Sequence, residues 1–205
     1  MIKIWGRANS SNVKKVLWCA EELQIPYQRL DAGGAYGIVD TAAFGEKNPN
    51  HRVPVLEDEG LVLWESNSIV RYLAARYGAG TFYSTDPAAR ALADRWMDWS
   101  SITLGPPFVT VFWNLVRVSP DQRDHAAIQA AVKASADILR VAEAALARQP
   151  FLSGPQFGMG DIPLGCLIHA WLHLVARPEL THISRWYERL LGRPAYKNVV
   201  AVPLS

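Results

Sequence analysis

The sequence predicts an α/β unit followed by an all-helical unit, and three observations lead to that fold class. Short apolar runs bounded by turn residues alternate with helical periods through the first 78 residues. Residues 79–86 carry Gly, Ser, Thr and Asp, a composition typical of a linker. From residue 87 to residue 205 the recognisable periodicity is helical. We therefore expect domains at 1–78 and 87–205, joined by the linker at 79–86.

The first unit opens with a strand, a helix and a second strand. Ile2 to Trp5 reads as a strand, and apolar residues then recur every three or four positions from Asn12 onwards. Pro26 ends this helix, and Tyr27 to Leu30 gives the next strand. The glycine-rich segment 32–47 that follows is irregular, with room for one short helix.

A hairpin and a helix complete the first unit. Two short apolar runs, Val53–Leu56 and Leu61–Trp64, flank the turn Asp58-Glu59-Gly60. Glu65-Ser66 then opens a helix that ends near Tyr77. Strand–helix–strand followed by strand–strand–helix (βαβ-ββα) is the thioredoxin-like pattern. The start of this last helix leaves free N–H groups beside a strand edge, an arrangement that favours a carboxylate.

The second unit is predicted to be helical throughout. Residues 88–116 have helical periodicity, and Gly105-Pro106-Pro107 should kink or split that helix. Pro120 is expected to begin a long helix, and the almost wholly apolar stretch 161–176 to form a buried one. Residues 180–191 form a last helix before an irregular tail.

Composition and charge exclude several classes of protein. Of the 205 residues 50% are hydrophobic and 20% charged, and the net charge is +2, too small to indicate nucleic acid or an anionic membrane as a partner. The Lys14-Lys15 pair is expected on a solvated helix face. Cys19 and Cys166 are far apart, so we expect buried inert thiols rather than a disulfide or a metal site. The sequence shows neither a signal peptide nor a membrane span, so we expect a cytoplasmic protein.

The segment from Val53-Pro54 through the hairpin to Leu-x-x-Trp-Glu-Ser resembles the glutathione-binding half of the cytosolic glutathione transferases. The resemblance extends over nearly the whole chain and is to the bacterial, serine-type, theta- or delta-like members. It implies that Pro54 is cis and that the backbone of Val53 pairs with the cysteinyl backbone of glutathione like an added strand. It also implies that Glu65 and Ser66 bind the γ-glutamyl end.

The resemblance places the catalytic group in the loop after the first strand. Aligning the Lys-Val-Leu of the first helix with serine-type members puts their catalytic serine at Ser10 and an asparagine that also faces the sulfur at Asn12. Ser11 is the other residue in this loop whose side chain could donate a hydrogen bond to the sulfur. The structural alternative is that these Ser and Asn residues only cap the helix.

Three further residues receive roles from the resemblance. His51 is expected to meet the glycyl carboxylate of glutathione, with Arg52 as the alternative contact. Asp98, on the first long helix of the second unit, corresponds to an acid that reaches the γ-glutamyl amine across a dimer; a solvated helix acid is the alternative. The chain departs from the insect-type pattern at Val39, where some members have a second histidine, and at Asn67, where they have arginine.

The function implied is that of a glutathione transferase. Glutathione would be bound, its thiolate stabilised, and the sulfur added to a small hydrophobic electrophile held by helices of the second unit, for example by Ile102, Phe108 and Trp113. A homodimer is implied by the family, and no metal is required. Two alternatives stay open: a glutathione-dependent peroxidase, dehalogenase or isomerase on the same scaffold, or a non-catalytic binding or regulatory protein that keeps the fold.

One departure concerns folding. The family usually has Ser or Thr three residues before the aspartate that starts the buried helix, whereas this chain has Gly158 three residues before Asp161. The side-chain cap is therefore missing. We expect Asp161 to matter for folding more than for binding.

Overall fold

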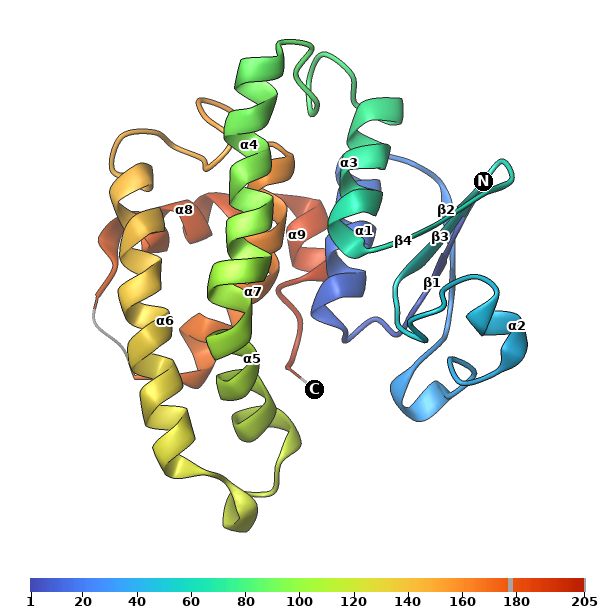
Figure 1. Cartoon of the computed structure of the whole chain (residues 1–205). Helices are drawn as coiled ribbons and strands as arrows, with labels where there is room; N and C mark the ends of the chain where they lie inside the picture. The colour runs from blue at the N-terminus through green and yellow to red at the C-terminus, as the bar shows by residue number, and fades with distance from the viewer. Residues whose placement is uncertain (177–178, 205) are drawn as a thin grey trace. The chain divides into compact units, whose positions relative to one another are not determined.

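The structure is a computed structural model, and it describes residues 1–176 and 179–204. The chain divides into two compact units between Thr85 and Asp86, at the end of the segment interpreted as a linker. Figure 1 shows that the strands all belong to the first unit and that the second is built of helices. The predicted fold class, a thioredoxin-like α/β unit followed by a helical one, is confirmed.

A mixed four-stranded sheet forms the first unit, in the order β2-β1-β3-β4. Its strands are β1 (Ile2–Trp5), β2 (Tyr27–Leu30), β3 (Val55–Asp58) and β4 (Leu61–Trp64). Its helices are α1 (Ser11–Glu22), the short α2 (Ala42–Gly45), α3 (Ser66–Tyr77) and the 3₁₀ turn η1 (Gly34–Tyr36). β1 and β2 run parallel, joined by α1, whereas β3 runs antiparallel to both β1 and β4.

The third strand begins two residues later than the sequence predicts. Val53 and Pro54 lie outside the ladder, and the Val53–Pro54 peptide bond is cis, as the resemblance implies. Proline has no N–H to donate to a ladder, so pairing starts only at Val55. This leaves Val53 beside the sheet rather than inside it.

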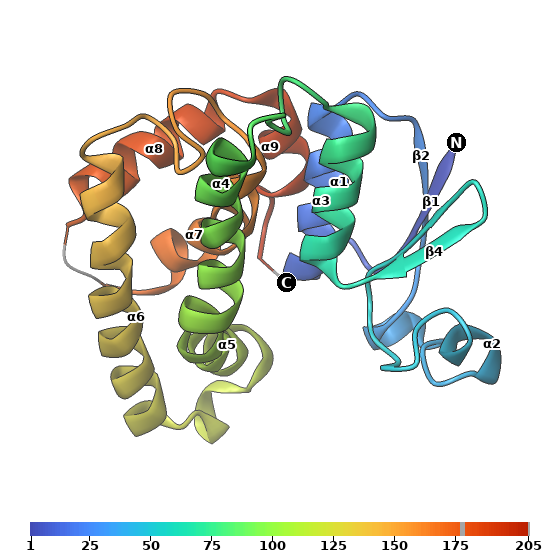
Figure 2. The same ribbon diagram turned by 45° about the horizontal axis from the view of Figure 1, so that its top comes forward.

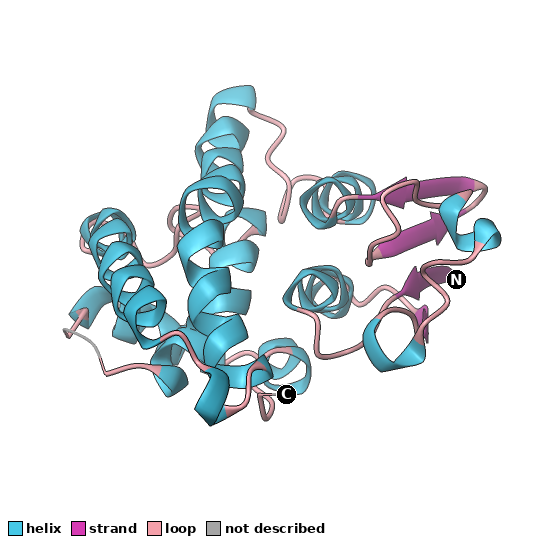
Figure 3. Cartoon of the chain, turned by 60° about the horizontal axis from the view of Figure 1, so that its bottom comes forward, coloured by secondary structure: helices cyan, strands magenta, loops and turns pink. Residues whose placement is uncertain are grey.

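Alternation along the strands divides the apolar side chains between the two faces of the sheet. Trp5 and Val55 pair across β1 and β3 and pack with Phe44 of α2. Ile4 and Leu56, also paired, point to the opposite face and are fully buried. Figures 2 and 3 show α1 and α3 lying side by side, and they pack against each other. The starts of these two helices therefore come close together.

A polar cluster fixes α3 against the β3–β4 hairpin. The buried Asp58 accepts hydrogen bonds of 2.8 Å from the hydroxyls of both Tyr72 and Tyr77. Burial, together with the hydrogen bond to Asp58, raises the pKa of Tyr72 to about 12. Both phenols therefore remain donors at neutral pH. These bonds hold the C-terminal half of α3 against the hairpin.

Glu57 joins the sheet to the segment around α2, and its charge should make stability depend on pH. Its carboxylate accepts from Lys47 Nζ and from Trp5 Nε1, both at 2.7 Å. The hydrogen bond from Lys47 is the main cause that lowers the pKa of Glu57. A lowered folded-state pKa contributes stability above the ordinary glutamate value of about 4.3, and that contribution is lost as pH falls through the folded-state pKa.

We therefore expect Glu57→Gln to destabilise the protein at pH 7 and to match wild type at acid pH. Urea unfolding of both proteins across a pH series measures this difference. A destabilisation that stays constant down to pH 3 would show that the charge on Glu57 contributes nothing.

The second unit consists of helices. They are α4 (Pro87–Trp99), α5 (Gly105–Phe112), α6 (His125–Leu146), α7 (Ile162–Leu174), α8 (Thr181–Leu191) and α9 (Pro194–Val199). Two π-helical segments, Ser100–Leu104 and Trp113–Arg117, flank α5. Short 3₁₀ turns lie at Pro120–Gln122 and Met159–Asp161.

One sequence prediction for this unit is confirmed and two were wrong in detail. The helix is interrupted at Gly105-Pro106-Pro107, because the π-helical segment Ser100–Leu104 separates α4 from α5 and the prolines occupy the first turn of α5. The long helix α6 begins at His125 rather than at Pro120, since the Asp124 side chain caps it by accepting from the Ala127 N–H at 2.9 Å. The tail contains the additional helix α9, which places the fully buried Tyr196 in the core.

Asp161 lies at the centre of the second unit and is completely buried. One carboxylate oxygen accepts from the Leu152 N–H at 2.7 Å and from Trp186 Nε1 at 2.8 Å. The other accepts from the N–H groups of Ser153 and Gly158, both at 3.2 Å. Gly158 supplies only its backbone, so the predicted absence of a side-chain cap is confirmed. Asp161 therefore connects a loop, a helix start and α8 through four hydrogen bonds.

Both cysteines are free and buried, Cys19 in the first unit and Cys166 in the second. Burial raises the pKa of the Cys19 thiol above its ordinary value, which keeps it protonated and unreactive. The expectation of buried, unbridged thiols is confirmed. Among the described residues, the helices are too short or too polar to cross a bilayer.

Candidate functional site

The loop between β1 and α1 is shaped by a close approach at Gly6. A β-carbon there would lie 2.4 Å from Val13 Cγ2 and 3.3 Å from Val53 Cβ, and the backbone has φ +153°. Only glycine fits this position. The loop that carries Ser10 therefore runs directly beside Val53.

Ser10 stands immediately before α1 but its side chain does not cap the helix. Its backbone is extended, with φ −85° and ψ 124°, and its hydroxyl makes no hydrogen bond to the first turn. The backbone carbonyl of Ser10 accepts the first helical bond from the Lys14 N–H at 2.8 Å. The capping interpretation thus lacks the hydrogen bond that defines it, and the half-buried hydroxyl is available for another partner.

Asn12 meets Ser66, so the structure brings together two segments that are 54 residues apart. The Ser66 hydroxyl donates to Asn12 Oδ1 at 3.3 Å, and Lys15 Nζ donates to Ser66 Oγ at 3.5 Å. Asn12 and Ser66 lie in the first turns of α1 and α3. Two helix starts, each with unpaired N–H groups and a positive dipole end, therefore adjoin at this point.

Lys14 and Lys15 are not on a solvated face, and that expectation was wrong. The two residues are only 7% and 5% exposed. Helical periodicity predicts burial only for the apolar residues of α1, and so it assigned the two lysines to the solvent-exposed face. A long side chain can bury its stem and still place its ammonium on a polar partner, as Lys15 does with Ser66.

Val53 offers an unused backbone edge next to this pair of helix starts. Within residues 1–176 and 179–204, neither its N–H nor its C=O takes part in a hydrogen bond. Its side chain packs on the cluster of Ala32, Phe44 and Val55, which fixes its place. An extended peptide can pair with such an edge as an added strand.

The loop before Val53 holds His51 and Arg52 in a defined shape. The buried Asn48 donates to the Arg52 carbonyl at 2.7 Å and accepts from the Asn50 N–H at 3.0 Å. His51 has φ +53°, a conformation rare for a residue with a side chain. Its Nδ1 lies 2.6 Å from the Val39 carbonyl oxygen. Because a carbonyl only accepts, Nδ1 carries a proton, and the side chain of His51 is exposed.

Gly45 leaves the space that the His51 ring occupies. A β-carbon on Gly45 would lie 2.9 Å from His51 Cε1 and 3.3 Å from Nε2. We expect Gly45→Ala to displace the ring. It should thereby weaken the binding of glutathione, the ligand that the resemblance implies, about tenfold, because one hydrogen bond to a charged group is lost. Titration calorimetry measures this effect. Stability should not fall, since alanine favours helix α2.

The matched control for this prediction is the double variant. In a His51→Ala background the Gly45→Ala change should weaken binding no further. An equal additional loss in that background would show that Gly45 does not act through His51.

Glu65 is strained at the start of α3. Its backbone has φ +69° and ψ 111°, and its exposed side chain does not cap the helix. A non-glycine residue in this region costs on the order of 1–3 kcal/mol, and such residues concentrate at functional sites. Ser66, the next residue, is buried and begins the first turn of α3.

Nine of the ten predicted site residues lie in the first unit, and the tenth, Asp98, lies in the second. Ser10, Ser11 and Asn12 lie at the start of α1, His51 and Arg52 precede Val53-Pro54, and Glu65 and Ser66 begin α3. Asp98 is exposed on α4 in the second unit, so its role toward a ligand stays a prediction. Sequence reasoning missed the parts of Asn48 and Gly45, whose partners lie a few residues away along the chain, and that of Lys15, which contacts the distant Ser66.

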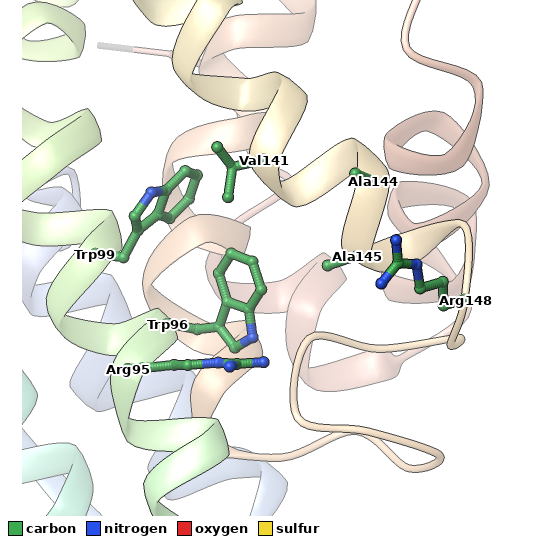
Figure 4. A pocket seen from close by; sticks show the side chains of 7 residues that line it. All are labelled: Arg95, Trp96, Trp99, Val141, Ala144, Ala145 and Arg148. Carbon is green, nitrogen blue, oxygen red and sulfur yellow. The ribbon is translucent and has the colours of Figure 1, made fainter.

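The helical unit has an open pocket of about 380 Å³ between α4 and α6, shown in Figure 4. Trp96 and Trp99 pack edge to face at 5.3 Å and form one wall, and the Arg95 guanidinium lies 5.5 Å from the Trp96 ring. Trp96 is buried, with 5% of its surface exposed, whereas Trp99 is half-buried. Phe108 belongs to the core, whereas Ile102 and Trp113 are exposed.

The first unit thus defines a class of protein: a thioredoxin-like domain with a free backbone edge after a cis proline, beside two adjoining helix starts. Comparison with known families identifies the class further. The family model for the glutathione S-transferase N-terminal domain matches residues 9–76, and that for the C-terminal domain matches residues 125–189. The chain belongs to the glutathione S-transferase family.

Individual relatives support the same assignment over the full length. Glutathione S-transferase GstB of Escherichia coli (strain K12) is 44% identical over 100% of both chains. Glutathione S-transferase 3 of Zea mays is 30% identical over 99% of this chain and 95% of its own. The crystal structure of the theta class glutathione S-transferase of Xanthomonas axonopodis pv. citri with glutathione bound is 54% identical, covers 100% of this chain and 99% of its own, and superposes with a TM-score of 0.97.

Proposed function

We propose that this protein is a glutathione transferase that binds glutathione, lowers the pKa of its thiol and adds the sulfur to a small hydrophobic electrophile. The observation that carries the proposal is the contact of Asn12 with Ser66 beside the unpaired backbone of Val53. This arrangement supplies donors for a carboxylate and a strand edge for a peptide in one place. A glutathione-bound relative at 54% identity supports the same ligand.

In this proposal each part of glutathione meets a different group. Val53 pairs with the cysteinyl backbone, and Ser66 with Glu65 binds the γ-glutamyl end. His51, or Arg52, meets the glycyl carboxylate. Since Nδ1 of His51 already donates to Val39, only the imidazolium form can donate through Nε2 to an anion. The sulfur then lies toward the loop that carries Ser10.

Ser10 is the group we assign to the thiol, with Ser11 and Asn12 as neighbouring donors. A free thiol has a pKa of about 8.5, and the thiolate is the nucleophile. A hydroxyl that donates to the sulfur stabilises the anion, and the adjoining start of α1 adds its dipole. The thiolate then attacks the electrophilic carbon, a C–S bond forms, and the leaving group departs with the electron pair.

The test is a conjugation assay with glutathione and an activated aryl chloride, together with calorimetry of glutathione binding. We expect saturable binding and a rate well above the uncatalysed reaction. Binding without acceleration on a panel of aryl, alkyl and epoxide electrophiles would contradict the transferase proposal.

We propose that the helical unit supplies the electrophile pocket and that two copies form a dimer. Large apolar side chains exposed on α4, α5 and the adjoining π segments support an interface: Leu92 is 51%, Ile102 74%, Val109 59% and Trp113 58% exposed. In a dimer Asp98 of one copy would approach the γ-glutamyl amine bound to the other. Light scattering on the purified protein tests the dimer, and a monomer at micromolar concentration would contradict it.

We also propose that the protein is located in the cytoplasm. Its two free thiols support a reducing compartment.

A further inference from the structure

The carbonyl oxygen of Gly6 is held by a side chain of the neighbouring strand. Gly6 follows the last residue of β1, and its N–H donates to the Leu30 carbonyl at 2.8 Å. Its own carbonyl accepts from Arg29 Nη1 on β2 at 3.0 Å. The next N–H, that of Arg7, donates to the Ala32 carbonyl at 3.0 Å. The chain that leaves β1 toward α1 is therefore bonded to β2 and to the residues after it, and a side chain makes one of these bonds.

Arg29 is itself held in place by a carboxylate. The same nitrogen that reaches Gly6 also donates to Asp31 Oδ1. Residues two apart in an extended chain lie on one face, which brings the two side chains together. They are 30% and 38% exposed, so solvent reaches the pair only in part. A charged hydrogen bond of this kind restricts a long side chain that would otherwise take many rotamers. Asp31 therefore keeps Arg29 in the orientation that reaches Gly6.

Gly6 connects Arg29 to two parts of the candidate site. Its α-carbon lies against Val53, since a β-carbon there would come within 3.3 Å of Val53 Cβ. The residue that follows it, Arg7, accepts through its carbonyl from the Ser10 N–H at 3.2 Å. A movement of the Gly6 peptide would thus change the separation between Val53 and the loop that carries Ser10.

That separation matters for the proposed activation of the thiol. Val53 is assigned to the cysteinyl backbone, and so it sets where the sulfur lies, while the Ser10 hydroxyl donates to the sulfur from another segment. A donor acts at full strength only within about 0.5 Å of its productive position, because a hydrogen bond weakens steeply with distance and angle. The two segments must therefore be fixed relative to each other.

We propose that Arg29 is a positioning residue for thiol activation, which fixes the Ser10 loop against Val53 by holding the Gly6 carbonyl. This inference rests on the proposed function and deepens it. Arg29 touches neither glutathione nor the electrophile in this account. Its effect should therefore appear in the ionisation of the bound thiol more than in the affinity for glutathione.

The test compares Arg29→Met with Gln28→Met. Methionine at position 29 keeps an unbranched side chain and removes both the donor and the charge. Gln28→Met places the same side chain at the exposed neighbouring position of β2 and is the matched control. Each change is made in wild type and in Ser10→Ala. Ultraviolet difference spectra at saturating glutathione give the pKa of the bound thiol, and calorimetry of glutathione binding and thermal unfolding are measured in parallel.

In the wild-type background we expect Arg29→Met to raise the pKa of the bound thiol by about half a unit to one unit, because the hydroxyl leaves its productive position. At pH 7 kcat/KM should fall about two- to eightfold, which is the matching loss of thiolate. Glutathione affinity should stay within about threefold, since Glu65 and Ser66 are not disturbed. Gln28→Met should match wild type in each measurement. An unchanged thiol pKa in folded Arg29→Met would overturn the proposal.

The Ser10→Ala background separates position from charge. Removal of a cation by itself disfavours a nearby thiolate, wherever Ser10 lies. If Arg29 acts through Ser10, Arg29→Met should leave the thiol pKa unchanged once the hydroxyl is absent. A rise of equal size in both backgrounds would show that only the charge of Arg29 matters, and the positioning role would be refuted.

If Arg29→Met does not fold, Asp31→Ala decides. Loss of the Asp31 charge alone would lower the thiol pKa, whereas an Arg29 side chain released from its acceptor would let the Ser10 loop shift and raise it. A raised pKa supports the proposal, and an unchanged or lowered pKa overturns it. If wild type does not bind glutathione or leaves its thiol pKa unshifted, the proposed function fails, and the inference fails with it. A lowered pKa in wild type that Ser10→Ala restores and Arg29→Met does not change overturns the inference alone.

Discussion

Replacing Asp161 with alanine is expected to lower the free energy of unfolding by about 4 kcal/mol, because four N–H groups lose their acceptor. Each buried donor without a partner costs about 1–3 kcal/mol, and partial relaxation reduces the sum. For a chain of 205 residues, the corresponding fall in melting temperature is on the order of 10 °C. Urea unfolding and thermal scans measure both quantities. Glutathione affinity of the folded fraction should stay close to wild type.

Two variants sharpen this prediction. Asp161→Asn should lie between wild type and alanine, since Oδ1 can still accept from Leu152 and Trp186 while the amide faces the donors of Ser153 and Gly158. Asp137→Ala makes the same substitution at an exposed position of α6 and should change stability by less than about 0.5 kcal/mol. An unchanged stability in Asp161→Ala would contradict the role assigned to this carboxylate.

Replacing Ser10 with alanine is expected to lower kcat/KM at pH 7 roughly 10- to 25-fold and to leave glutathione affinity almost unchanged. If the hydroxyl lowers the thiol pKa by one to two units, its loss costs about 1.4–3 kcal/mol of thiolate stabilisation. With a free thiol pKa of about 8.5, the thiolate fraction at pH 7 then falls about 8- to 25-fold. Steady-state kinetics with an activated aryl chloride measure the effect, and the loss should shrink at alkaline pH as the unassisted thiol ionises.

Ser11→Ala and Asn12→Ala are the controls for Ser10, because both residues lie in the first turn of α1, directly after Ser10. Ser11→Ala should retain most activity. Asn12→Ala removes the acceptor that faces Ser66 and should change glutathione affinity more than the rate at saturation. A full loss of rate in Ser11→Ala with Ser10→Ala near wild type would move the catalytic role to Ser11.

The elements of the first unit follow from local patterns, and so they could be predicted from the sequence. Three of its four strands begin and end where the apolar runs predict, since period-two alternation and turn residues are local signals. The exception is β3, where an apolar residue, Val53, serves as a free edge rather than as a ladder residue. Nothing in the hydrophobicity of valine distinguishes the two uses.

The contacts within the site were less accessible to sequence reasoning. The loop 48–52 was singled out for His51 and Arg52, but its shape depends on Asn48, whose polar side chain is buried. The lysines of α1 were read as solvated because a helical period counts only apolar residues. Lys15 contacts Ser66 across 51 positions of sequence. Such pairs arise from the packing of α1 on α3, which no local pattern encodes.

In the second unit the helix ends were the weakest predictions. The capping side chain of Asp124 decides where α6 begins, and prolines in the first turn are compatible with the start of α5. The sequence indicates that Asp161 is important for folding. It does not show which groups donate to the carboxylate, because these are backbone N–H groups of the preceding loop and the Trp186 side chain on α8.

The most direct test of the central claim is the pKa of the glutathione thiol in the bound state. Ultraviolet difference spectra of the thiolate, recorded across pH on wild type and Ser10→Ala at saturating glutathione, measure it. We predict a pKa one to two units below the free value of about 8.5 in wild type, returning toward that value in Ser10→Ala. A bound thiol with an unshifted pKa in wild type would contradict thiol activation by this site.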